Sequence, residues 1–327
     1  MSEFVKVSNL VKNYGSLCAV DNLSFSVNEG EIFGLLGPNG AGKSTTINIL
    51  TTLSEYDGGS VTIGGFDSVK KREAMKKLIG IVPQDIALHP FLTAYENVCF
   101  FASLYGLSGK QLKKAALLAL EFVGLSDKAS VRMNRMSGGM KRRLNIACGI
   151  AHSPKLIVMD EPTVGVDAQS RDLILHSIQV LRKQGATVIY TSHYMQEVEE
   201  ICDRIAIVDK GRMIACGTEK ELVTFVTDRK QYEAEVKLLQ GFDKTAFYKE
   251  ILSLPDIKDV MLTDSEGKTV LRVDTGLEFD NLMQLMLVVQ KNHIHIKAIN
   301  SRVPSLDSMF LTLTGHDMQT NTGCAPS

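Results

Sequence analysis

The sequence predicts an α/β fold with a mostly parallel core sheet, an antiparallel β edge and a helical insert, followed by a small C-terminal α+β domain. Three observations support this prediction. Apolar runs alternate with helical stretches up to about Gly217, the stretch over about residues 87–150 is mainly helical, and the pattern changes after Gly217. Apolar runs separated by helices are typical of a parallel sheet covered on both faces. We therefore expect a first domain over residues 1–226 and a second over residues 227–319.

The expected strands of the first domain are of two kinds. Leu23–Val27 alternates apolar and polar side chains, as a half-exposed strand does. Three later runs are apolar almost throughout and are expected to be buried strands: Ile32–Leu36, Leu156–Met159 and Thr187–Tyr190.

Two helix starts are predicted within the insert. Thr93 and Glu96 have the spacing of a capping box, and so do Ser108 and Gln111. Each pair precedes an apolar-rich stretch, so we expect a helix to begin at each.

The second domain is expected to follow the order βαββαβ, the split βαβ pattern. Its predicted strands are Tyr232–Leu238, Val260–Thr263, Thr269–Val273 and His295–Ile299, and its predicted helices are Lys244–Leu254 and Phe279–Gln290. Residues 320–327 are small and polar and are expected to be disordered.

Composition excludes several classes of protein. The 327 residues carry a formal net charge of −1, which gives no reason to expect nucleic acid as a partner. The 6 cysteines are scattered without a Cys-x-x-Cys pair, which disfavours a zinc cluster or a disulfide scaffold. The start resembles no secretory signal, and no apolar run approaches the ~20 residues that cross a bilayer. We expect a cytoplasmic protein that reaches a membrane only through another chain.

The strongest chemical signal is a phosphate-binding loop. Gly37-x-x-x-x-Gly42-Lys43-Ser44 has the P-loop spacing and follows the apolar run Ile32–Leu36. The glycines let backbone N–H groups turn toward phosphate oxygens, and the following helix directs its positive end at the same place. Lys43 would contact the β- and γ-phosphates, and the Ser44 hydroxyl would ligate Mg²⁺. The loop residues expected to bind nucleotide are Gly37, Pro38, Asn39, Gly40, Ala41, Gly42, Lys43, Ser44 and Thr45.

A pair of carboxylates gives the second signal. Asp160 and Glu161 end the apolar run that starts at Leu156. Asp160 is expected near Mg²⁺ at the carboxyl end of its strand, and Glu161 is suited to accept a proton from an attacking water. Taken alone, the dipeptide also fits a polar turn or a helix cap.

Ser137-Gly138-Gly139 is predicted to open a helix with Ser137 at the N-cap. The cations Lys141–Arg143 follow at once, and a helix N-terminus with clustered cations makes an anion site. Taken alone, the same residues fit a flexible turn with a solvated run of charge.

Over about Val5 to Gly217 the sequence resembles the nucleotide-binding subunit of ABC transporters, because the motifs of that family occur in it in the expected order. Gly37 to Thr45 is similar to the Walker A loop and Leu156 to Glu161 to Walker B. Met136 to Met140 resembles the signature motif, although that motif usually begins with Leu and ends with Gln. The backbone-lined Ser-Gly-Gly is intact, but a polar contact from position 140 is lost.

The resemblance implies further site residues. Tyr14 resembles the aromatic residue that stacks on adenine, and Gln84 the Q-loop glutamine, which would contact the nucleotide and its metal ion. Asp167 falls in the D-loop, and His193 resembles the switch histidine that senses the γ-phosphate. Glu161, His193 and Lys43 would be the catalytic residues, with ATP and Mg²⁺ as cofactors. Two subunits, identical or different, would face head to tail, so that Ser137, Gly138 and Gly139 serve the neighbour's ATP.

The segment Val303 to Gly315 resembles the closing motif of daunorubicin-resistance-type exporter ATPases, and it also fits an amphipathic helix packed on the small domain. That family works with ABC-2-type membrane subunits. The resemblance therefore implies the ATP-hydrolysing subunit of an exporter for a drug-like, antibiotic or lipidic compound. The alternatives are an ABC importer ATPase and a soluble ABC ATPase of translation or DNA repair.

Overall fold

The computed structural model describes residues 2–192, 194–226, 229–238, 242–265, 268–276, 281–302 and 310. The chain divides into two compact units, the first built from the residues up to Glu219 and the second beginning at Lys220. Helix α8 (Glu219–Val226) spans the interval between this division and the domain boundary expected after residue 226.

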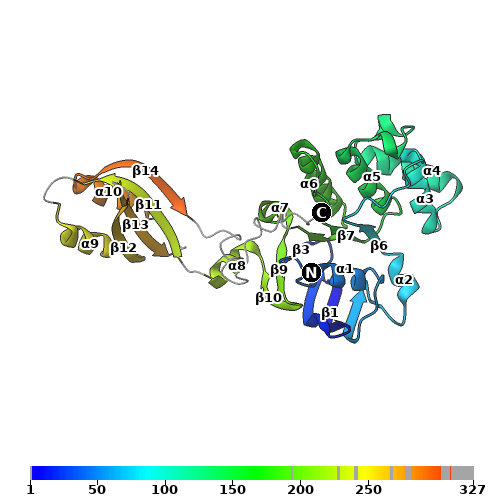
Figure 1. Ribbon diagram of the computed structural model, residues 1–327, viewed down its shortest axis with the longest axis horizontal. Helices are drawn as coiled ribbons and strands as arrows, with labels where there is room; N and C mark the ends of the chain where they lie inside the picture. The colour runs from blue at the N-terminus through cyan, green and yellow to red at the C-terminus, as the bar shows by residue number, and fades with distance from the viewer. Residues whose placement is uncertain are drawn as a thin grey trace. The chain divides into compact units, whose positions relative to one another are not determined.

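The first unit contains a six-stranded sheet in the order β10-β9-β3-β8-β7-β6 (Figure 1). The strands are β3 (Ile32–Leu36), β6 (Ile79–Val82), β7 (Leu156–Asp160), β8 (Thr187–Thr191), β9 (Arg204–Asp209) and β10 (Arg212–Gly217). All neighbours are parallel except β9 and β10, which form an antiparallel edge. Every residue of β3 and β8 is buried, as the continuous apolar runs predict.

A separate antiparallel sheet in the order β2-β1-β4-β5 lies beside this core. Its strands are β1 (Glu3–Tyr14), β2 (Leu17–Asn28), β4 (Gly58–Ile63) and β5 (Phe66–Asp67). The side chains of Leu23, Phe25 and Val27 are buried while Ser24 is exposed, so the predicted alternation is confirmed. The two sheets share one hydrophobic core, to which Phe33 and Val158 of the parallel sheet also belong.

Helices connect several of the strands of the first unit. They are α1 (Lys43–Leu50), α2 (Arg72–Lys76), α3 (Ala94–Leu104), α4 (Gly109–Phe122), α5 (Gly138–Ile150), α6 (Ala168–Lys183) and α7 (Met195–Ile201). Helices α3, α4 and α5 pack on one another and form the helical part of residues 87–150 (Figure 1).

The two predicted capping boxes differ in outcome. The one at Thr93 is confirmed, because the Thr93 hydroxyl accepts from the Glu96 N–H and the Glu96 carboxylate accepts from the Thr93 N–H. The one at Ser108 is wrong. Ser108 holds the N-cap position, but its side chain makes no capping hydrogen bond. Gly109, the first helical residue, has φ of 56°, so the first turn is not helical enough to place its N–H groups around the Ser108 hydroxyl.

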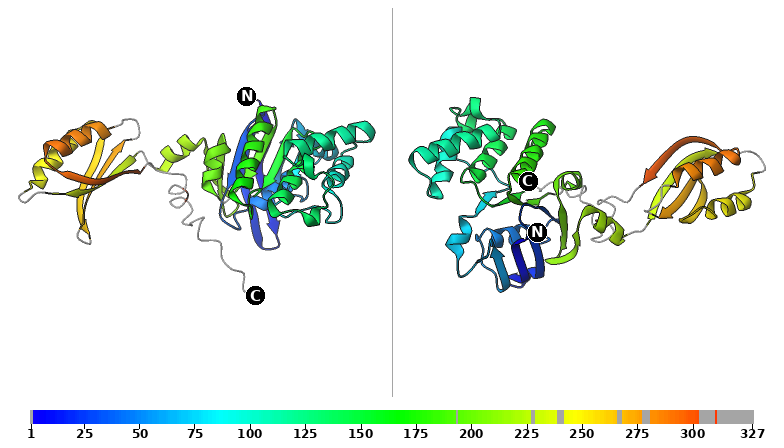
Figure 2. Two further views of the ribbon diagram at one scale, coloured as in Figure 1. Left: turned by 90° about the horizontal axis from the view of Figure 1, so that it is seen from above. Right: turned by 180° about the vertical axis from the view of Figure 1, so that it is seen from behind.

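The second unit has the predicted order βαββαβ. Its elements are β11 (Arg229–Lys237), α9 (Lys244–Leu252), β12 (Ile257–Ser265), β13 (Lys268–Gly276), α10 (Leu282–Lys291) and β14 (His295–Arg302). The strands form an antiparallel sheet in the order β12-β13-β11-β14, and both helices cover the same face of it (Figure 2). Its core includes Tyr232, Val273, Phe247 and Leu285.

Two predictions concern residues outside those described. The closing motif Val303 to Gly315 lies there, apart from the buried Phe310, and so do residues 320–327. Within the described residues, no helix is both long enough and apolar enough to span a bilayer.

Candidate functional site

The phosphate-binding loop joins β3 to α1, as predicted. Gly42 is the N-cap of α1 and has φ of 99°, a conformation that residues with side chains rarely adopt. A Cβ atom at Gly37 would collide with the Val208 carbonyl oxygen of β9. Glycine is therefore needed at Gly42 for its dihedral angle and at Gly37 for the space beside the neighbouring strand.

Lys43 lies inside the loop with only 7% of its surface exposed. Its Nζ donates to the carbonyl oxygens of Gly37 at 2.7 Å and Pro38 at 3.2 Å. Burial lowers the pKa of Lys43, and the charges of Glu161 and Asp160 act in the opposite direction. The loop thus holds an ammonium group among its own backbone atoms, next to two carboxylates.

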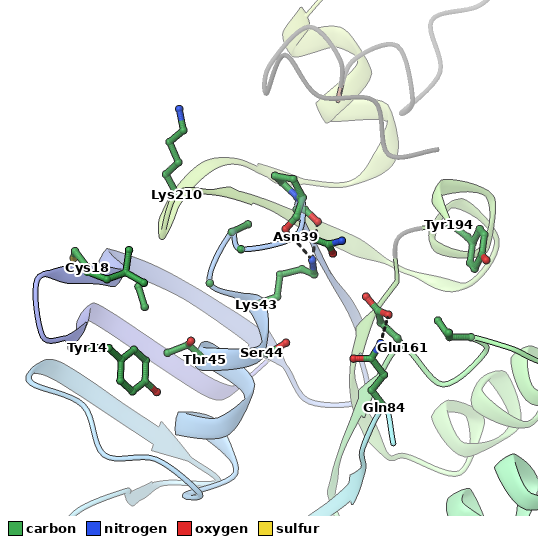
Figure 3. A pocket seen from close by; sticks show the side chains of 18 residues that line it. Tyr14, Cys18, Asn39, Lys43, Ser44, Thr45, Gln84, Glu161, Tyr194 and Lys210 are labelled. Carbon is green, nitrogen blue, oxygen red and sulfur yellow. Dashed lines mark hydrogen bonds between the residues drawn. The ribbon is translucent and has the colours of Figure 1, made fainter. Parts of the chain in front are cut away.

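A cavity of about 660 Å³ opens over this loop (Figure 3). The predicted residues that line it are Tyr14, Gly37, Pro38, Asn39, Gly40, Ala41, Gly42, Lys43, Ser44, Thr45, Gln84 and Glu161. Tyr14, at the end of β1, is 50% exposed, so its ring is available for stacking on a planar ligand. The lining thus brings the loop, the ring and one carboxylate together.

The lining also includes Val164, at the start of the segment that resembles the D-loop, and five residues that the sequence did not single out: Leu17, Cys18, Ala19, Tyr194 and Lys210. Lys210 lies in the turn between β9 and β10, and its exposed side chain extends away from the phosphate loop (Figure 3).

Glu161 follows β7 and is 8% exposed. Its φ of 46° is in the left-handed region, which is uncommon for a residue with a side chain. The Gln84 Nε2 donates to Glu161 Oε2 at 2.9 Å, so Gln84 and the expected base are in direct contact (Figure 3). Backbone strain at a site residue is typical of functional positions.

Thr191, at the end of β8, holds both acidic residues, and the sequence did not assign it a role. Its hydroxyl donates to Asp160 Oδ1 at 2.7 Å and accepts from the Glu161 N–H at 2.9 Å. Burial raises the pKa of Asp160, while the Thr191 hydrogen bond acts in the opposite direction and the Glu161 charge reinforces the rise. A cation beside Asp160 would favour the charged form.

The donor set fits Mg²⁺. Ser44 and Gln84 line the cavity, and Asp160 lies at the carboxyl end of β7. Hydroxyl, amide and carboxylate oxygens are ligands that Mg²⁺ accepts, and in nucleotide sites it takes only one or two protein ligands besides phosphate oxygens and water.

Glu197, on α7, was also missed by the sequence reasoning. Its side chain is buried, and Oε2 accepts hydroxyl hydrogen bonds from Thr163, Tyr190 and Ser192 at 2.7–2.8 Å. These three residues come from the segment after Glu161, from β8 and from the residue before His193. Glu197 therefore connects, by hydrogen bonds, the segment after the expected base Glu161 to Ser192, the residue before the expected switch histidine. His193 itself lies outside the described residues.

The Ser137-Gly138-Gly139 segment does not line the cavity. Ser137 caps α5, as predicted, by accepting from the Met140 N–H at 3.2 Å. A Cβ atom at Gly139 would collide with Ser170 of α6, whereas one at Gly138 would meet nothing closer than 3.9 Å. Asp167 caps α6 through the Ser170 N–H at 2.9 Å and also lies outside the cavity lining. The signature segment thus packs directly on the start of α6.

Two of the three cations after this segment, Arg142 and Arg143, do not form the expected anion site, and they are not part of a solvated run either. Arg142 is buried and donates to the Pro83 carbonyl oxygen at 3.0 Å. Arg143 donates to the Val123 carbonyl oxygen at 2.9 Å. Both guanidinium groups turn into the subunit and donate to backbone carbonyl oxygens there.

Comparison with known proteins gives consistent matches. A sequence model described as ABC transporter matches residues 20–164. The linearmycin resistance ATP-binding protein LnrL of Bacillus subtilis (strain 168) is 43% identical over 96% of this chain and 99% of its own length. The Nod factor export ATP-binding protein I of Paraburkholderia xenovorans (strain LB400) is 35% identical over 97% and 98%.

A third relative, the doxorubicin resistance ATP-binding protein DrrA of Mycobacterium tuberculosis (strain ATCC 25618 / H37Rv), is 34% identical over 95% of this chain and 93% of its own length. Among solved structures, a dimeric ATP-binding cassette in a post-hydrolysis state, bound to ADP and Pi, superimposes with a TM-score of 0.60. It is 29% identical, and the match covers 65% of this chain and 98% of the solved one.

Proposed function

Since the chain belongs to the family of ABC transporter ATP-binding proteins, we propose that it hydrolyses ATP to export a drug-like, antibiotic or lipidic compound through a separate membrane subunit. One observation carries this proposal: the match to relatives named for drug resistance or export extends over both units, not over the cassette alone. An importer ATPase or a soluble ATPase of translation or DNA repair has no such support.

The proposed chemistry assigns a task to each side of the cavity. The backbone of Gly37 to Thr45 holds the phosphates, the ammonium of Lys43 moves from loop carbonyls to phosphate oxygens, and Tyr14 stacks on the adenine. Glu161, held by Gln84, accepts the proton of the attacking water. His193 contacts the γ-phosphate.

Mg²⁺ would be held by Ser44, Asp160 and Gln84, and it would neutralise charge that develops on the phosphate oxygens. Thr191 positions Asp160 for this role through the 2.7 Å hydrogen bond. This hydrogen bond fixes the rotamer of Asp160 and so reduces the freedom lost on binding.

The proposed active form is a dimer of ATPase subunits, identical or different, in which Ser137, Gly138, Gly139 and Asp167 serve the nucleotide of the neighbour. The position of these residues outside the cavity of their own chain supports this assignment. The open space around Gly138 would let a phosphate approach the backbone N–H groups at the start of α5.

The proposed partner is an ABC-2-type membrane subunit, and the chain would be peripheral on the cytoplasmic face of the membrane. The division into a cassette, with its helical insert at about 87–150, and an accessory domain over 227–319 is part of this proposal. Docking to the membrane subunit is assigned to the surface around Gln84 and to the helical insert.

Replacing Glu161 by Gln tests the chemistry. We expect ATP binding to be retained and turnover to fall by roughly 10²-fold or more, since a general base is lost. Glu200→Gln, an exposed change elsewhere in the first unit, serves as the control and should leave turnover unchanged. Wild-type turnover in Glu161→Gln would show that the base is wrongly assigned.

Export itself is tested in a strain that lacks its own efflux pumps. The chain is expressed with a candidate membrane subunit, and accumulation of labelled doxorubicin is measured with the wild type and with Glu161→Gln. We expect lower accumulation only with the wild type. Equal accumulation, together with co-purification on ribosomes, would favour a soluble ATPase instead.

A further inference from the structure

Arg142 is a buried cation that the proposed chemistry does not use. It lies on the second turn of α5, three residues after Gly139 of the signature segment, and is 5% exposed. One terminal nitrogen donates to the Pro83 carbonyl oxygen at 3.0 Å and the other to the Val164 carbonyl oxygen at 3.5 Å. A buried guanidinium is costly unless its donors are satisfied, so this placement needs a reason.

The Pro83 carbonyl lies directly before Gln84. A second side chain of α5, that of Asn145, donates to the same oxygen at 3.3 Å. Gln84 in turn donates to Glu161 at 2.9 Å. Hydrogen bonds therefore connect the helix that starts at Ser137 to the backbone of the Q-loop, and the Q-loop to the expected base.

The second contact of Arg142 reaches the other side of the same base. Val164 lies three residues after Glu161, between the base and Asp167, and it also lines the cavity. The charges of Asp85 and Glu161 act on the guanidinium and oppose the lowering of its pKa by burial. Arg142 thus bridges the two segments that flank Glu161.

The next residue shows that this bridge is specific. Arg143 carries the same group on the same helix, but it donates to the Val123 and Gly124 carbonyls after α4 at 2.9 and 3.2 Å. It therefore joins α5 to the end of α4 instead of the Q-loop, which makes it a matched control for Arg142.

We propose that Arg142 is a positioning residue that links the two ATP sites of the dimer, by setting the Gln84–Glu161 pair according to the position of the signature helix. The link rests on the proposed function, because the signature helix contacts the partner's nucleotide while Gln84 and Glu161 act on the chain's own. Movement of α5 toward the partner's ATP pulls on the Pro83 carbonyl and so on Gln84. Such a coupling acts equally in both directions at the level of binding free energy.

The test is a double-mutant cycle in the full-length chain. Arg142→Met and Gln84→Ala are made singly and together, and ATP turnover, its Hill coefficient and the melting temperature are measured. Arg142→Met should lower turnover on the order of tenfold and move the Hill coefficient toward one. ATP affinity, measured with a fluorescent ATP analogue at protein concentrations too low for dimers, should change by less than about twofold.

The cycle distinguishes a positioning role of Arg142 from a nonspecific loss of stability. If Arg142 acts through Gln84, Arg142→Met should have little further effect once Gln84 is Ala. Arg143→Met should not couple to Gln84→Ala. Arg142→Lys keeps the charge on a single donor nitrogen and should recover part of the turnover. It replaces Arg142→Met in the cycle if that variant does not fold.

Three results would overturn the link. They are turnover equal to wild type in folded Arg142→Met, a full effect of Arg142→Met in the Gln84→Ala background, and a wild-type Hill coefficient of one. In each of these the wild type still hydrolyses ATP and Glu161→Gln still lowers turnover, so the proposed function stands. A wild-type chain without ATPase activity would overturn both.

Discussion

The two units of the chain bury different kinds of side chain. Among the described residues of the first unit, five charged side chains are buried: Glu31, Lys43, Arg142, Glu161 and Glu197. In the described part of the second unit no charged residue is buried, and the buried polar residues are Thr275 and Asn281. The Asn281 Nδ2 donates to Thr275 Oγ1 and to the Pro255 carbonyl, so this pair is satisfied locally.

The difference shows where the chain bears the free-energy cost of burying charged side chains. Burying a charge is unfavourable unless it is compensated, so buried charges mark places where chemistry requires them. Burial alone is not sufficient, since Glu31 pairs with Arg204 at 3.3 Å and lies away from the cavity. In the second unit, the ion pairs Arg272–Glu233 and Lys297–Glu235 each join an exposed cation to a partly exposed glutamate.

The largest expected effect on stability is at Glu197. Replacing it by Ala removes the acceptor of three buried hydroxyls, which should lower the free energy of unfolding by roughly 3 kcal/mol. Turnover should also fall, because Thr163 and Ser192 lose their common partner. Chemical denaturation measures the first effect. Glu200→Ala on the exposed side of the same helix is the control, and equal losses in the two variants would contradict a special role for the buried carboxylate.

The next effect is on ATP binding. Lys43→Ala should weaken ATP affinity by roughly 10- to 100-fold, because charge-assisted hydrogen bonds to phosphate are lost. Isothermal titration calorimetry measures this change. Lys210→Ala removes another lysine of the same cavity, one whose side chain extends away from the loop, and should change affinity little. If both variants lost affinity equally, the cavity would act through overall charge rather than through the buried ammonium.

A smaller effect depends on pH. The His152 ring stacks on the Tyr105 ring with centroids 3.5 Å apart, and burial lowers the pKa of His152 to about 4. The folded pKa is below the unfolded one, so His152 contributes stability that is present above pH ~6.5 and lost as the pH falls toward 4. The loss should be about 2 kcal/mol, less than the full shift implies because the ring is partly exposed.

Melting temperatures of the wild type and His152→Gln between pH 7 and pH 4 measure this effect. The variant should show a shallower pH dependence. The control is His295→Gln, at an exposed residue of the second unit, which should keep the wild-type slope. An unchanged slope in His152→Gln would mean that other groups account for the acid sensitivity.

The smallest effect is expected at the surface ion pairs of the second unit. Arg272→Met breaks the contact with Glu233 at 2.7 Å, and because the Arg272 side chain is open to solvent, the pair contributes only about 0.2–1 kcal/mol. Chemical denaturation of the full chain measures the change, and ATP turnover should stay at the wild-type level. A decrease in the free energy of unfolding as large as that of Glu197→Ala would contradict the proposed difference between the units.

Much of the fold was predictable because its signals are local. Ile32–Leu36 and Leu156–Met159 indicate buried strands by unbroken apolar runs, and both are strands of the core sheet. The phosphate loop is recognisable because its backbone conformation needs glycine at fixed spacing. The Ser108 capping box failed for a local reason that spacing does not reveal, the left-handed Gly109.

The missed residues depend on long-range contacts. Thr191 contacts Glu161 across 30 positions, and Glu197 contacts Thr163 across 34, so no local pattern reveals either role. A weak signal existed for Glu197, since it lies four residues before Ile201 and therefore on the same, apolar side of a helix. Arg142 was hidden in a run of three cations, where only the structure separates buried from exposed.

The left-handed backbone at Glu161 has a consequence for engineering this chain. A residue with a side chain at φ of 46° costs the folded state roughly 1 kcal/mol, which glycine would not. Selection for thermal stability alone would therefore favour Glu161→Gly, and the same change would remove the carboxylate expected to activate water. At this position the residue that supports activity lowers thermal stability. A library of variants screened only for heat resistance should therefore accumulate subunits that are stable but inactive.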